Sequence, residues 1–299
     1  MKILVTGAAG QVGWELARLL PALGEVVAID VEEMDLARPD DIRRVLRDVR
    51  PDVVVNPGAY TAVDKAESEP ELARLINGVA PSVMAEELRA TGGLLIHYST
   101  DYVFDGTKTG AYTELDAPNP MSVYGATKLE GERAIQDVGG TYVILRTSWV
   151  YGARGKNFLL TMLKLFEERD ELRVVDDQIG GPTWCRWLAE TTSRVLSAYA
   201  RDADSATRDL SGIYHATASG ATSWFGFASA IRDARYAGQT KSGPRLVPIR
   251  TEEYPLPAKR PANSVLSNAK LQARFGVRPV SWNEQLSGCM ASMGTPETS

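Results

Sequence analysis

Short runs of β-branched and other apolar residues recur in the first half of the chain and alternate with longer stretches of mixed polarity. Five runs have the composition of fully buried strands: K-I-L-V-T (2–6), V-V-A-I-D (26–30), D-V-V-V-N (52–56), L-L-I-H-Y-S-T (94–100) and Y-V-I-L-R-T (142–147). Stretches with helical spacing of apolar residues separate them, at 11–23, 39–49, 70–91 and 119–137. Buried strands that alternate with helices predict an α/β fold, a doubly wound parallel sheet with helices on both faces.

The pattern is less regular in the second half. We expect helices at 157–170, 184–201 and near 282–293, and strands at 173–176 and 212–216. A polar loop at 202–209 and proline-rich stretches around 244–262 interrupt them, and the tail G-T-P-E-T-S (294–299) is expected to be disordered. This irregular order of strands, helices and loops predicts a smaller second domain built from separate segments.

The composition is that of a globular protein, and its charge narrows the range of partners. Of 299 residues, 44% are apolar and 24% are charged, with a net charge of −5 and a pI near 5.3. An acidic balance argues against nucleic acid or a membrane surface as a partner, but not against a phosphorylated small molecule. No apolar run approaches the roughly 18 residues of a membrane span, and the polar start M-K-I-L-V-T-G lacks a signal-peptide core. We therefore expect a cytoplasmic protein.

Two cysteines and two histidines offer little metal or redox chemistry. The spacing of Cys185, Cys289, His97 and His215 matches no zinc site, and a disulfide framework needs more cysteines in a shorter chain. We expect two buried or indifferent thiols in a reducing compartment. His97 lies inside a buried strand and is interpreted as a satisfied core histidine.

The segment T-G-A-A-G-Q-V-G (6–13) follows the first strand and opens the first helix. Gly7, Gly10 and Gly13 have the spacing G-x-x-G-x-x-G, a variant of the dinucleotide-binding fingerprint. Such glycines make a tight turn, let a pyrophosphate approach the backbone and pack the helix on the sheet. The phosphates would lie on free amides at the positive end of the helix dipole. The segment predicts a Rossmann-type domain that binds NADPH or NADH.

An acidic residue stands where this fold places the adenosine ribose. Asp30 ends the second strand, and its carboxylate would accept hydrogen bonds from ribose hydroxyls; the alternative is a turn or helix N-cap aspartate. A carboxylate here favours NADH, because it repels a 2′-phosphate. The other predicted cofactor contacts are Asp35 and Leu36 beside the adenine, and Ala59, Tyr60 and Thr61 on the nicotinamide side.

The stretch S-V-Y-G-A-T-K-L-E-G-E (122–132) joins a tyrosine and a lysine within one predicted helix. We interpret N-P (119–120) as the helix start, which puts Tyr124 and Lys128 one turn apart on one face. A nearby ammonium would lower the tyrosine pKa from its usual value of about 10. Alone, this pattern is equally typical of a surface Tyr–Lys pair. With the glycine turn and the strand-end hydroxyls of Ser99-Thr100, it predicts a proton-transfer site.

Two glycines interrupt the same helix. Glycine costs a helix interior roughly 1 kcal/mol relative to alanine. Gly125 and Gly131 therefore indicate that the cofactor or neighbouring elements approach the helix closely.

These motifs resemble those of the extended short-chain dehydrogenases/reductases. More closely, A-V-D-K-A-E-S-E-P-E-L-A, H-Y-S-T-D-Y-V-F, R-T-S-W-V-Y-G and R-P-A-N-S are similar to segments of the dTDP-4-dehydrorhamnose reductase family. The resemblance extends to about residue 290. It implies NAD(P)H-dependent reduction of the C4 keto group of a dTDP-linked sugar, the last step of dTDP-rhamnose biosynthesis. The domain division that we expect is 1–150 for the NAD(P)-binding domain, with 182–215 returning to it, and 151–299 mostly for the substrate-binding domain.

The resemblance also implies roles for individual residues. Thr100, Tyr124 and Lys128 would form the catalytic set, in which hydride reaches the carbonyl carbon, Tyr124 donates the proton and Lys128 holds the nicotinamide ribose. Gly10, Gln11 and Val12 would contact the pyrophosphate. Asp101, Trp149 and Arg260, together with Thr100, would contact the sugar nucleotide; the alternatives are a core aromatic for Trp149 and a solvated loop residue for Arg260.

The resemblance also bears on metal binding and on the oligomeric state. Some family members hold magnesium through glutamates at a dimer contact. Glu15 matches one such position, but Arg186 stands at another, and an arginine is no ligand for a cation. We expect no metal ligands, leave magnesium as an alternative, and expect a monomer or homodimer.

Rival functions on the same fold remain open. A sugar-nucleotide dehydratase needs a second acid after Thr100-Asp101, where this chain has Tyr102. An epimerase or another sugar-nucleotide reductase fits the chemistry but fits T-D-Y-V-F-D-G and R-T-S-W-V-Y-G less well. A non-catalytic regulatory subunit would bind nucleotide without turnover, and an intact Thr100, Tyr124 and Lys128 set argues against it.

Overall fold

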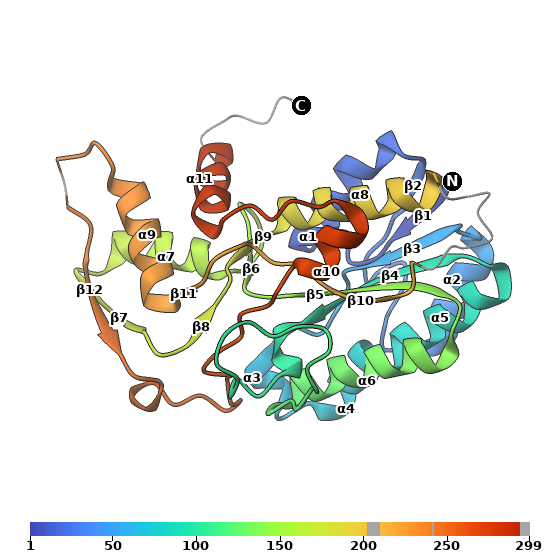
Figure 1. Cartoon of the computed structure of the whole chain (residues 1–299), viewed down its shortest axis with the longest axis horizontal. Helices are drawn as coiled ribbons and strands as arrows, with labels where there is room; N and C mark the ends of the chain where they lie inside the picture. The colour runs from blue at the N-terminus through green and yellow to red at the C-terminus, as the bar shows by residue number, and fades with distance from the viewer. Residues whose placement is uncertain (202–209, 241, 294–299) are drawn as a thin grey trace.

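A six-stranded parallel sheet forms the centre of the larger part of the molecule (Figure 1). The computed structural model describes residues 1–201, 210–240 and 242–293. The strand order is β10-β5-β4-β3-β1-β2. The strands are β1 (Lys2–Val5), β2 (Glu25–Ala28), β3 (Val53–Asn56), β4 (Leu94–Thr100), β5 (Thr141–Thr147) and β10 (Gly212–His215). The predicted doubly wound parallel sheet is confirmed, and its order reverses beside β1, which places a crevice at the carboxyl ends of β1 and β3.

Helices cover both faces of this sheet. One face packs against α1 (Gln11–Leu19), with its 3₁₀ extension Leu20–Ala22, and against α8 (Cys185–Arg201) and α10 (Ala269–Phe275). The other face packs against α2 (Pro39–Val49), α5 (Ala80–Thr91) and α6 (Val123–Val138). Alternate strand residues serve the two sides, because neighbouring side chains of a strand point to opposite faces. Ile3 and Val5 lie in the first core, and Leu4 lies in the second.

The smaller part is built from segments far apart in the sequence. Its sheet pairs β7 (Glu171–Val175) with β12 (Arg245–Ile249), and its helices are α7 (Phe158–Glu168), α9 (Trp224–Tyr236) and α11 (Trp282–Met293). Two short pairs lie between the parts: β6 (Val150–Tyr151) with β9 (Thr183–Trp184), and β8 (Ile179–Gly180) with β11 (Thr222–Ser223). Helix α8 packs on α1, and β10 extends the large sheet. The division of the chain into two domains stays a prediction.

Several local predictions need correction. The predicted helix 70–91 consists of α4 (Pro70–Arg74), a π-helical segment (Leu75–Val79) and α5. The helix expected from residue 119 begins at Val123, because the Ser122 side chain accepts the capping hydrogen bond from the Gly125 amide at 3.2 Å. The Asn119 side chain instead donates to Asp105 Oδ2 at 3.0 Å.

Besides short elements such as α3 (Val63–Ala66), β6, β8, β9 and β11, the sequence patterns missed the longer elements α9, α10 and β12. Pro248 lies within β12, and a strand with one neighbour tolerates a proline that donates no ladder hydrogen bond. The shorter helical elements are α3 and the 3₁₀ turns Asp101–Val103 and Thr251–Glu253. The predicted loop at 202–209 and the tail at 294–299 lie outside the described residues.

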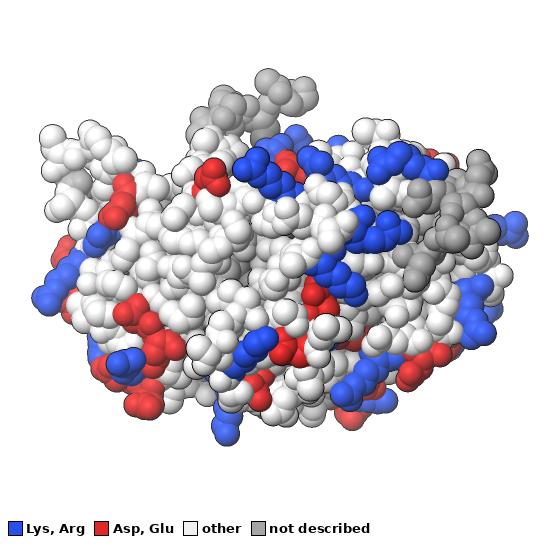
Figure 2. Space-filling model, in the orientation of Figure 1, with Lys and Arg blue, Asp and Glu red and all other residues white. Residues whose placement is uncertain are grey.

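Acidic and basic side chains share the visible surface. On the face shown in Figure 2, they lie around the rim and to the right of the centre, while the area left of the centre is largely uncharged. Within the described residues, no helix has the length and apolarity to cross a membrane.

Candidate functional site

The glycine-rich turn between β1 and α1 has the geometry that its spacing predicts. Gly7 has φ +55°, a left-handed conformation that favours glycine, and its carbonyl accepts from the Gly10 amide at 3.0 Å. A Cβ on Gly13 would lie 2.1 Å from the Gly7 carbonyl oxygen, so only glycine lets α1 begin so close to the turn. Gly10 is the N-cap of α1 and has no side chain to fill the space before the helix.

A cavity of about 530 Å³ opens in front of this turn. Eleven of the predicted cofactor residues line it: Gly7, Gly10, Gln11, Val12, Asp30, Asp35, Leu36, Ala59, Thr61, Tyr124 and Lys128. Ser99, of the Ser99-Thr100 pair at the end of β4, lines it too, as do residues that the sequence prediction missed, among them Tyr98, Thr147, Val150, Gly155 and Lys156. Thr147 lies at the carboxyl end of β5, where ligands of such sheets bind, so strand position alone is the signal that would have identified it.

Tyr60 differs from its predicted place because it is absent from the lining of this cavity. Its hydroxyl donates to Glu69 at 2.7 Å, and its amide donates to the Asn77 side chain at 2.9 Å. Its predicted cofactor contact is therefore not supported by the geometry.

Asp30 organises the turn in addition to facing the cavity. Its two carboxylate oxygens accept from the Ala9 amide at 2.7 Å and from the Val31 amide at 2.8 Å. The carboxylate thus ties the end of β2 to the glycine turn. It keeps lone pairs for a ribose hydroxyl, and that contact stays a prediction.

Tyr124 and Lys128 lie in the first two turns of α6, and both face the cavity. The two helix glycines permit close contact with neighbouring backbone. A Cβ on Gly125 would lie 2.2 Å from the Tyr102 carbonyl oxygen, and one on Gly131 would lie 2.2 Å from the Asn77 carbonyl oxygen. Both glycines therefore let neighbouring elements approach.

The electrostatics of this pair differ from the sequence prediction. Burial raises the pKa of Tyr124 to about 12, partly offset by its hydrogen bond with Thr100. Burial lowers the pKa of Lys128 to about 8, partly offset by the Glu132 carboxylate. The expected depression of the tyrosine pKa is absent, because burial outweighs the effects that lower it. Lys128 Nζ donates to the Tyr98 carbonyl oxygen at 2.6 Å. At neutral pH, Tyr124 is a phenol with a proton to donate.

Thr100 and Asp101 end β4 beside the tyrosine. Thr100 Oγ1 donates to Asp101 Oδ1 at 3.1 Å and accepts from the Tyr102 amide at 3.2 Å. Asp101 is buried, and burial raises its pKa to about 7. The Tyr102 ring meets the Tyr124 ring edge-on, with centroids 5.6 Å apart.

The other predicted substrate residues have partners within the chain. Trp149 has φ +46° and stacks on Trp224, with ring centroids 3.5 Å apart. The Arg260 guanidinium makes a two-point contact with Asp64, at 3.1 and 2.7 Å. Asp64 and the Ala258 carbonyl oxygen occupy only part of the five N–H donors of this guanidinium, so a phosphate contact would use the others.

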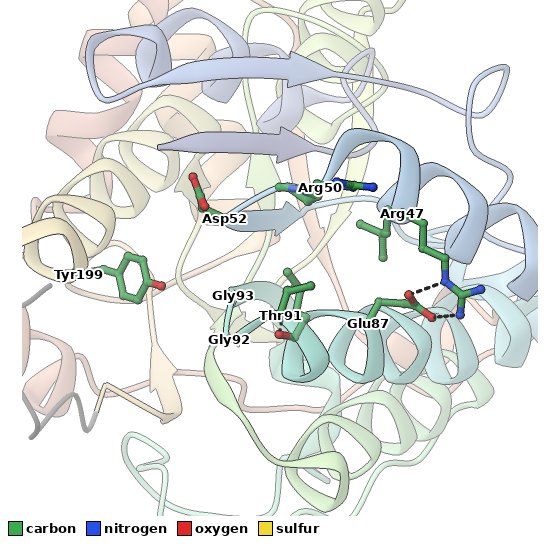
Figure 3. Close-up of a pocket in the computed structure, with 11 residues that line it drawn as sticks. Arg47, Arg50, Asp52, Glu87, Thr91, Gly92, Gly93 and Tyr199 are labelled. Atoms are coloured by element: carbon green, nitrogen blue, oxygen red, sulfur yellow. Dashed lines mark hydrogen bonds and ion pairs between the residues drawn. The ribbon is translucent and has the colours of Figure 1, made fainter.

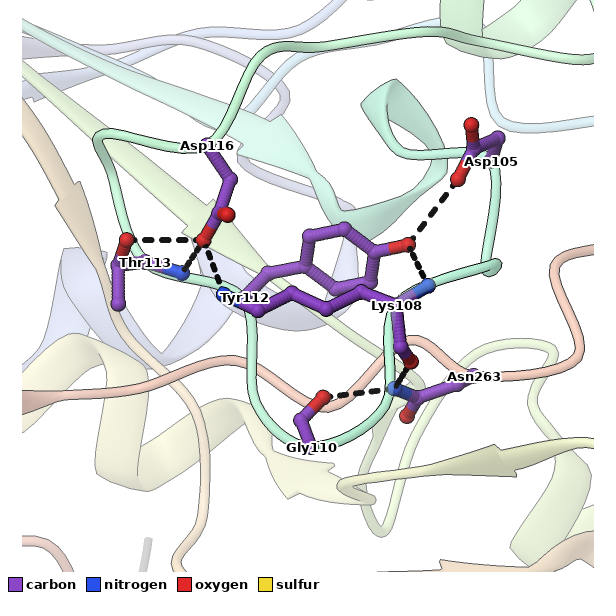
Figure 4. Close-up of polar contacts among 7 residues, drawn as sticks. All are labelled: Asp105, Lys108, Gly110, Tyr112, Thr113, Asp116 and Asn263. Carbon is purple, nitrogen blue, oxygen red and sulfur yellow. Dashed lines mark hydrogen bonds and ion pairs between the residues drawn. The ribbon is translucent and has the colours of Figure 1, made fainter.

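A polar network holds the loop between the Thr100 turn and α6 (Figure 4). Asp116 Oδ2 accepts from Lys108 Nζ and from the Thr113 amide, each at 2.6 Å. The Asn263 side chain donates to the carbonyl oxygens of Lys108 and Gly110, at 2.8 and 2.7 Å. The R-P-A-N-S segment therefore anchors the loop that leads into the helix of Tyr124.

A second cavity of about 360 Å³ lies at the opposite edge of the sheet (Figure 3). Asp52 and Gly93, which precede β3 and β4, line it, as does Tyr199 of α8. Its Arg47 side chain is paired with Glu87 at 2.9 and 2.7 Å. Because the glycine turn and the Tyr–Lys pair lie at the other edge, this cavity is not the candidate site.

The residues at the position considered for magnesium do not fit that ion. Arg186 Nε lies 3.7 Å from Glu15 Oε2, so a cation stands where a metal would have to bind. Within residues 1–201, 210–240 and 242–293, no three His, Cys, Asp or Glu side chains gather to hold a metal. Cys185 and Cys289 are free and buried, as predicted, and burial raises the pKa of both thiols.

A nucleotide turn at the carboxyl edge of a doubly wound sheet, with a Tyr–Lys pair facing the same cavity, is typical of NAD(P)-dependent oxidoreductases of the short-chain dehydrogenase/reductase class. The family model described as RmlD substrate binding domain matches residues 1–295, and the chain belongs to this family. The resemblance predicted from the motifs is thereby confirmed.

Similar proteins of known name agree with this assignment. A dTDP-4-dehydrorhamnose reductase of Burkholderia thailandensis is 50% identical over 98% of this chain and 99% of its own length. One from Escherichia coli K12 is 44% identical over 94% of each chain. Among solved structures, a dTDP-4-dehydrorhamnose reductase of Bacillus anthracis in complex with NADP has a TM-score of 0.88 and 34% identity, over 97% of this chain and 99% of that one.

Proposed function

We propose that this protein catalyses the NAD(P)H-dependent reduction of the C4 keto group of dTDP-4-dehydro-L-rhamnose to dTDP-L-rhamnose, the last step of dTDP-rhamnose biosynthesis. Relatives of that name match nearly the whole chain at 42–50% identity. The observation that carries the proposal is the protonated phenol of Tyr124, which lines the cofactor cavity one helical turn from the buried Lys128.

The chain's residues divide the work between binding and proton transfer. A reduced nicotinamide supplies the hydride when bound, and the glycine turn offers room for its pyrophosphate. Tyr124 donates its proton to the oxygen that gains negative charge, a contribution of roughly 10²–10⁴-fold to the rate. Thr100 orients the carbonyl oxygen, and Lys128 holds the nicotinamide ribose with its ammonium. NADPH and NADH are both proposed as cofactors.

Asp101, Trp149 and Arg260 are proposed to contact the sugar nucleotide. Asp101 and Thr100 share a hydrogen bond, so they act on the substrate side of Tyr124. A carbon on Gly180 would lie 2.5 Å from the Trp149 ring and 2.8 Å from Ser264 Oγ, so Trp149 lies beside the R-P-A-N-S segment that carries Arg260.

The wider setting is proposed on the same grounds. We place the protein in the cytoplasm as a monomer or homodimer, with a dTDP-sugar as its partner and neither nucleic acid nor membrane. The domain division is proposed as 1–150 with 182–215 for the cofactor, and most of 151–299 for the substrate.

The test is the absorbance of the reduced nicotinamide with dTDP-4-dehydro-L-rhamnose, for the native chain and for Tyr124→Phe. Rapid oxidation by the native chain and a loss of about 10²–10⁴-fold in kcat for the variant support the proposal. Tyr254→Phe, at an exposed tyrosine, is the control that retains activity. Cofactor binding without oxidation would move the assignment to another keto-sugar or to a regulatory role.

A further inference from the structure

His97 joins the lysine of the site to a buried chain of polar side chains. Its Nε2 lies 3.2 Å from Lys128 Nζ, and its Nδ1 lies 3.0 Å from Asn56 Nδ2. Asn56 Oδ1 accepts from the Thr6 hydroxyl at 2.6 Å. All four side chains are at most 2% exposed, so water does not compete for these bonds. The core-histidine interpretation is correct for burial but does not account for the contact with Lys128.

This series of hydrogen-bonded side chains ends at Thr6, beneath the glycine turn. Thr6 Oγ1 accepts from the Gly58 amide at 3.3 Å. Gly58 packs against Gly7, where an added Cβ would lie 3.0 Å from the Gly58 Cα. The Lys128 ammonium has three N–H groups: one donates to the Tyr98 carbonyl oxygen, one points to His97, and one is left for the cavity that Lys128 lines.

A neutral histidine has one donor nitrogen and one acceptor nitrogen. The hydrogen-bonded series of side chains from Thr6 to Lys128 therefore has two consistent states. If Lys128 is an ammonium, Nε2 of His97 must accept, Nδ1 carries the proton, and Asn56 must turn its amide oxygen to the ring. If Lys128 is a neutral amine, Nε2 carries the proton and donates to Nζ. Nδ1 then accepts from the Asn56 amide, whose oxygen faces Thr6. The amide orientation in the structure is the second one.

We propose that His97 and Asn56 are positioning residues for Lys128, and that the hydrogen bonds of the Thr6–Asn56–His97–Lys128 chain reverse direction when Lys128 loses its proton. The role of Lys128 in turnover rests on the proposed function, whereas the reversal itself does not. The coupling satisfies the side of Lys128 Nζ that faces residue 97 in both protonation states, as an acceptor for the ammonium and a donor to the amine, which an apolar residue at 97 would not do.

Among the groups around Lys128, His97 is the one whose hydrogen bonds can change when Lys128 loses its proton. Burial and the Lys128 charge hold the pKa of His97 well below its usual range, so it stays neutral. Glu132 is committed to Arg146 and Ser99. Of the remaining titratable neighbours, Tyr124 on the same helix is protonated at neutral pH, and Asp101 follows β4 beside it.

The direct test is ¹⁵N NMR of imidazole-labelled full-length protein, from well below to well above the Lys128 pKa of about 8. The chain has two histidines, so each signal is assigned by removing the other. We expect the protonated nitrogen of His97 to change from Nδ1 to Nε2 as Lys128 titrates, and Lys128→Met to abolish the change. His215, buried with both ring nitrogens unpartnered, is the internal control and should show no matching change. A single tautomer of His97 throughout the titration would overturn the proposal.

Kinetic variants test the positioning role separately. Asn56→Asp presents only acceptors, which favours the Nδ1–H tautomer and the ammonium, so the alkaline limb of the kcat profile should move up by about one pH unit. His97→Gln retains an acceptor and should keep about tenfold more kcat than His97→Leu, with little change in the KM of the sugar. His215→Gln should leave the profile unchanged. If His97→Gln and His97→Leu both fold and lose kcat equally, His97 contributes only by packing, and its positioning role is rejected. Failure of the native chain to oxidise reduced nicotinamide would reject the proposed function, while the NMR result would stand.

Discussion

Arg146 and Glu132 form a buried two-point ion pair that joins strand β5 to helix α6. Arg146 donates to the two Glu132 carboxylate oxygens at 2.9 and 2.6 Å, and the side chains are 2% and 1% exposed. Glu132 lies one turn beyond Lys128, so the pair fixes the helix that carries the proposed proton donor. Its charge also raises the pKa of Lys128 against the larger effect of burial.

Removing one partner of this pair should cost more stability than removing both. In Arg146→Met, Glu132 becomes an uncompensated buried charge, and we expect a loss of about 3–5 kcal/mol in the free energy of unfolding. The double variant with Glu132→Leu should recover much of the loss, as measured by denaturant titration. The exposed pair Arg44–Asp41 is the control, and Arg44→Ala should cost about 0–1 kcal/mol. A double variant no more stable than Arg146→Met would contradict this account.

Asp101→Asn should change the pH dependence of stability. The pKa of Asp101 rises from 3.8 to about 7 in the folded protein, so the native chain loses stability as pH rises between these values. The asparagine variant lacks this loss. From about pH 5 to about pH 8, the free energy of unfolding of the variant should therefore increase relative to that of the native chain, by about 3 kcal/mol at most, and its melting temperature should rise accordingly.

Asp105→Asn should change the pH dependence of stability in the opposite direction, because the pKa of Asp105 is lowered in the folded protein. The amide and hydroxyl of Thr107 and the Asn119 side chain hold the pKa of Asp105 well below its usual range. The native carboxylate therefore stabilises the fold above the unfolded pKa, and this stability is lost in acid. The variant should be less stable than the native chain at neutral pH, with a difference that shrinks as pH falls. For the preceding prediction, a stability difference between Asp101→Asn and the native chain that does not change with pH would contradict the raised pKa of Asp101.

Gly125→Ala should destabilise the protein even though alanine favours helices. Alanine gains roughly 1 kcal/mol of helix propensity over glycine. The new Cβ would lie 2.2 Å from the Tyr102 carbonyl oxygen, so the backbone must move, at about 1–3 kcal/mol. Because Tyr124 is the adjacent residue, kcat should fall together with the melting temperature. Gln136→Ala, at an exposed position of the same helix, should change neither; an unaltered Gly125→Ala protein would refute the close contact.

Asp30→Ala should shift the preference between the two cofactors. The carboxylate would repel a 2′-phosphate, and its removal also frees the Ala9 amide. We expect the KM for NADH to rise about tenfold and the KM for NADPH to rise less, a difference of about 1.4 kcal/mol at most. Steady-state kinetics with both cofactors measure this, and Glu32→Ala, at an exposed neighbour, is the control. An equal rise for both cofactors would show that Asp30 acts only through the turn.

Local patterns were sufficient where local physics decides the structure. The five central strands were predicted because buried strands need continuous apolar runs, and the glycine turn because only glycine fits its conformation and spacing. Tyr124 and Lys128 share a face because helical geometry requires it. By contrast, the start of α6 was misplaced by four residues, from 119 to 123, because Asn119 is engaged by Asp105 and Ser122 provides the cap.

The sequence by itself determined the strand–turn–helix order, the nucleotide turn and the residues at its carboxyl edge. Tertiary structure alone decided how these side chains are charged and paired. Burial, which depends on the whole fold, raises the pKa of Tyr124, and Asp64 reaches Arg260 across 196 positions of sequence. His97 meets Lys128 because β4 and α6 pack together. Such contacts arise from the closure of long loops and leave no periodic signal in the chain.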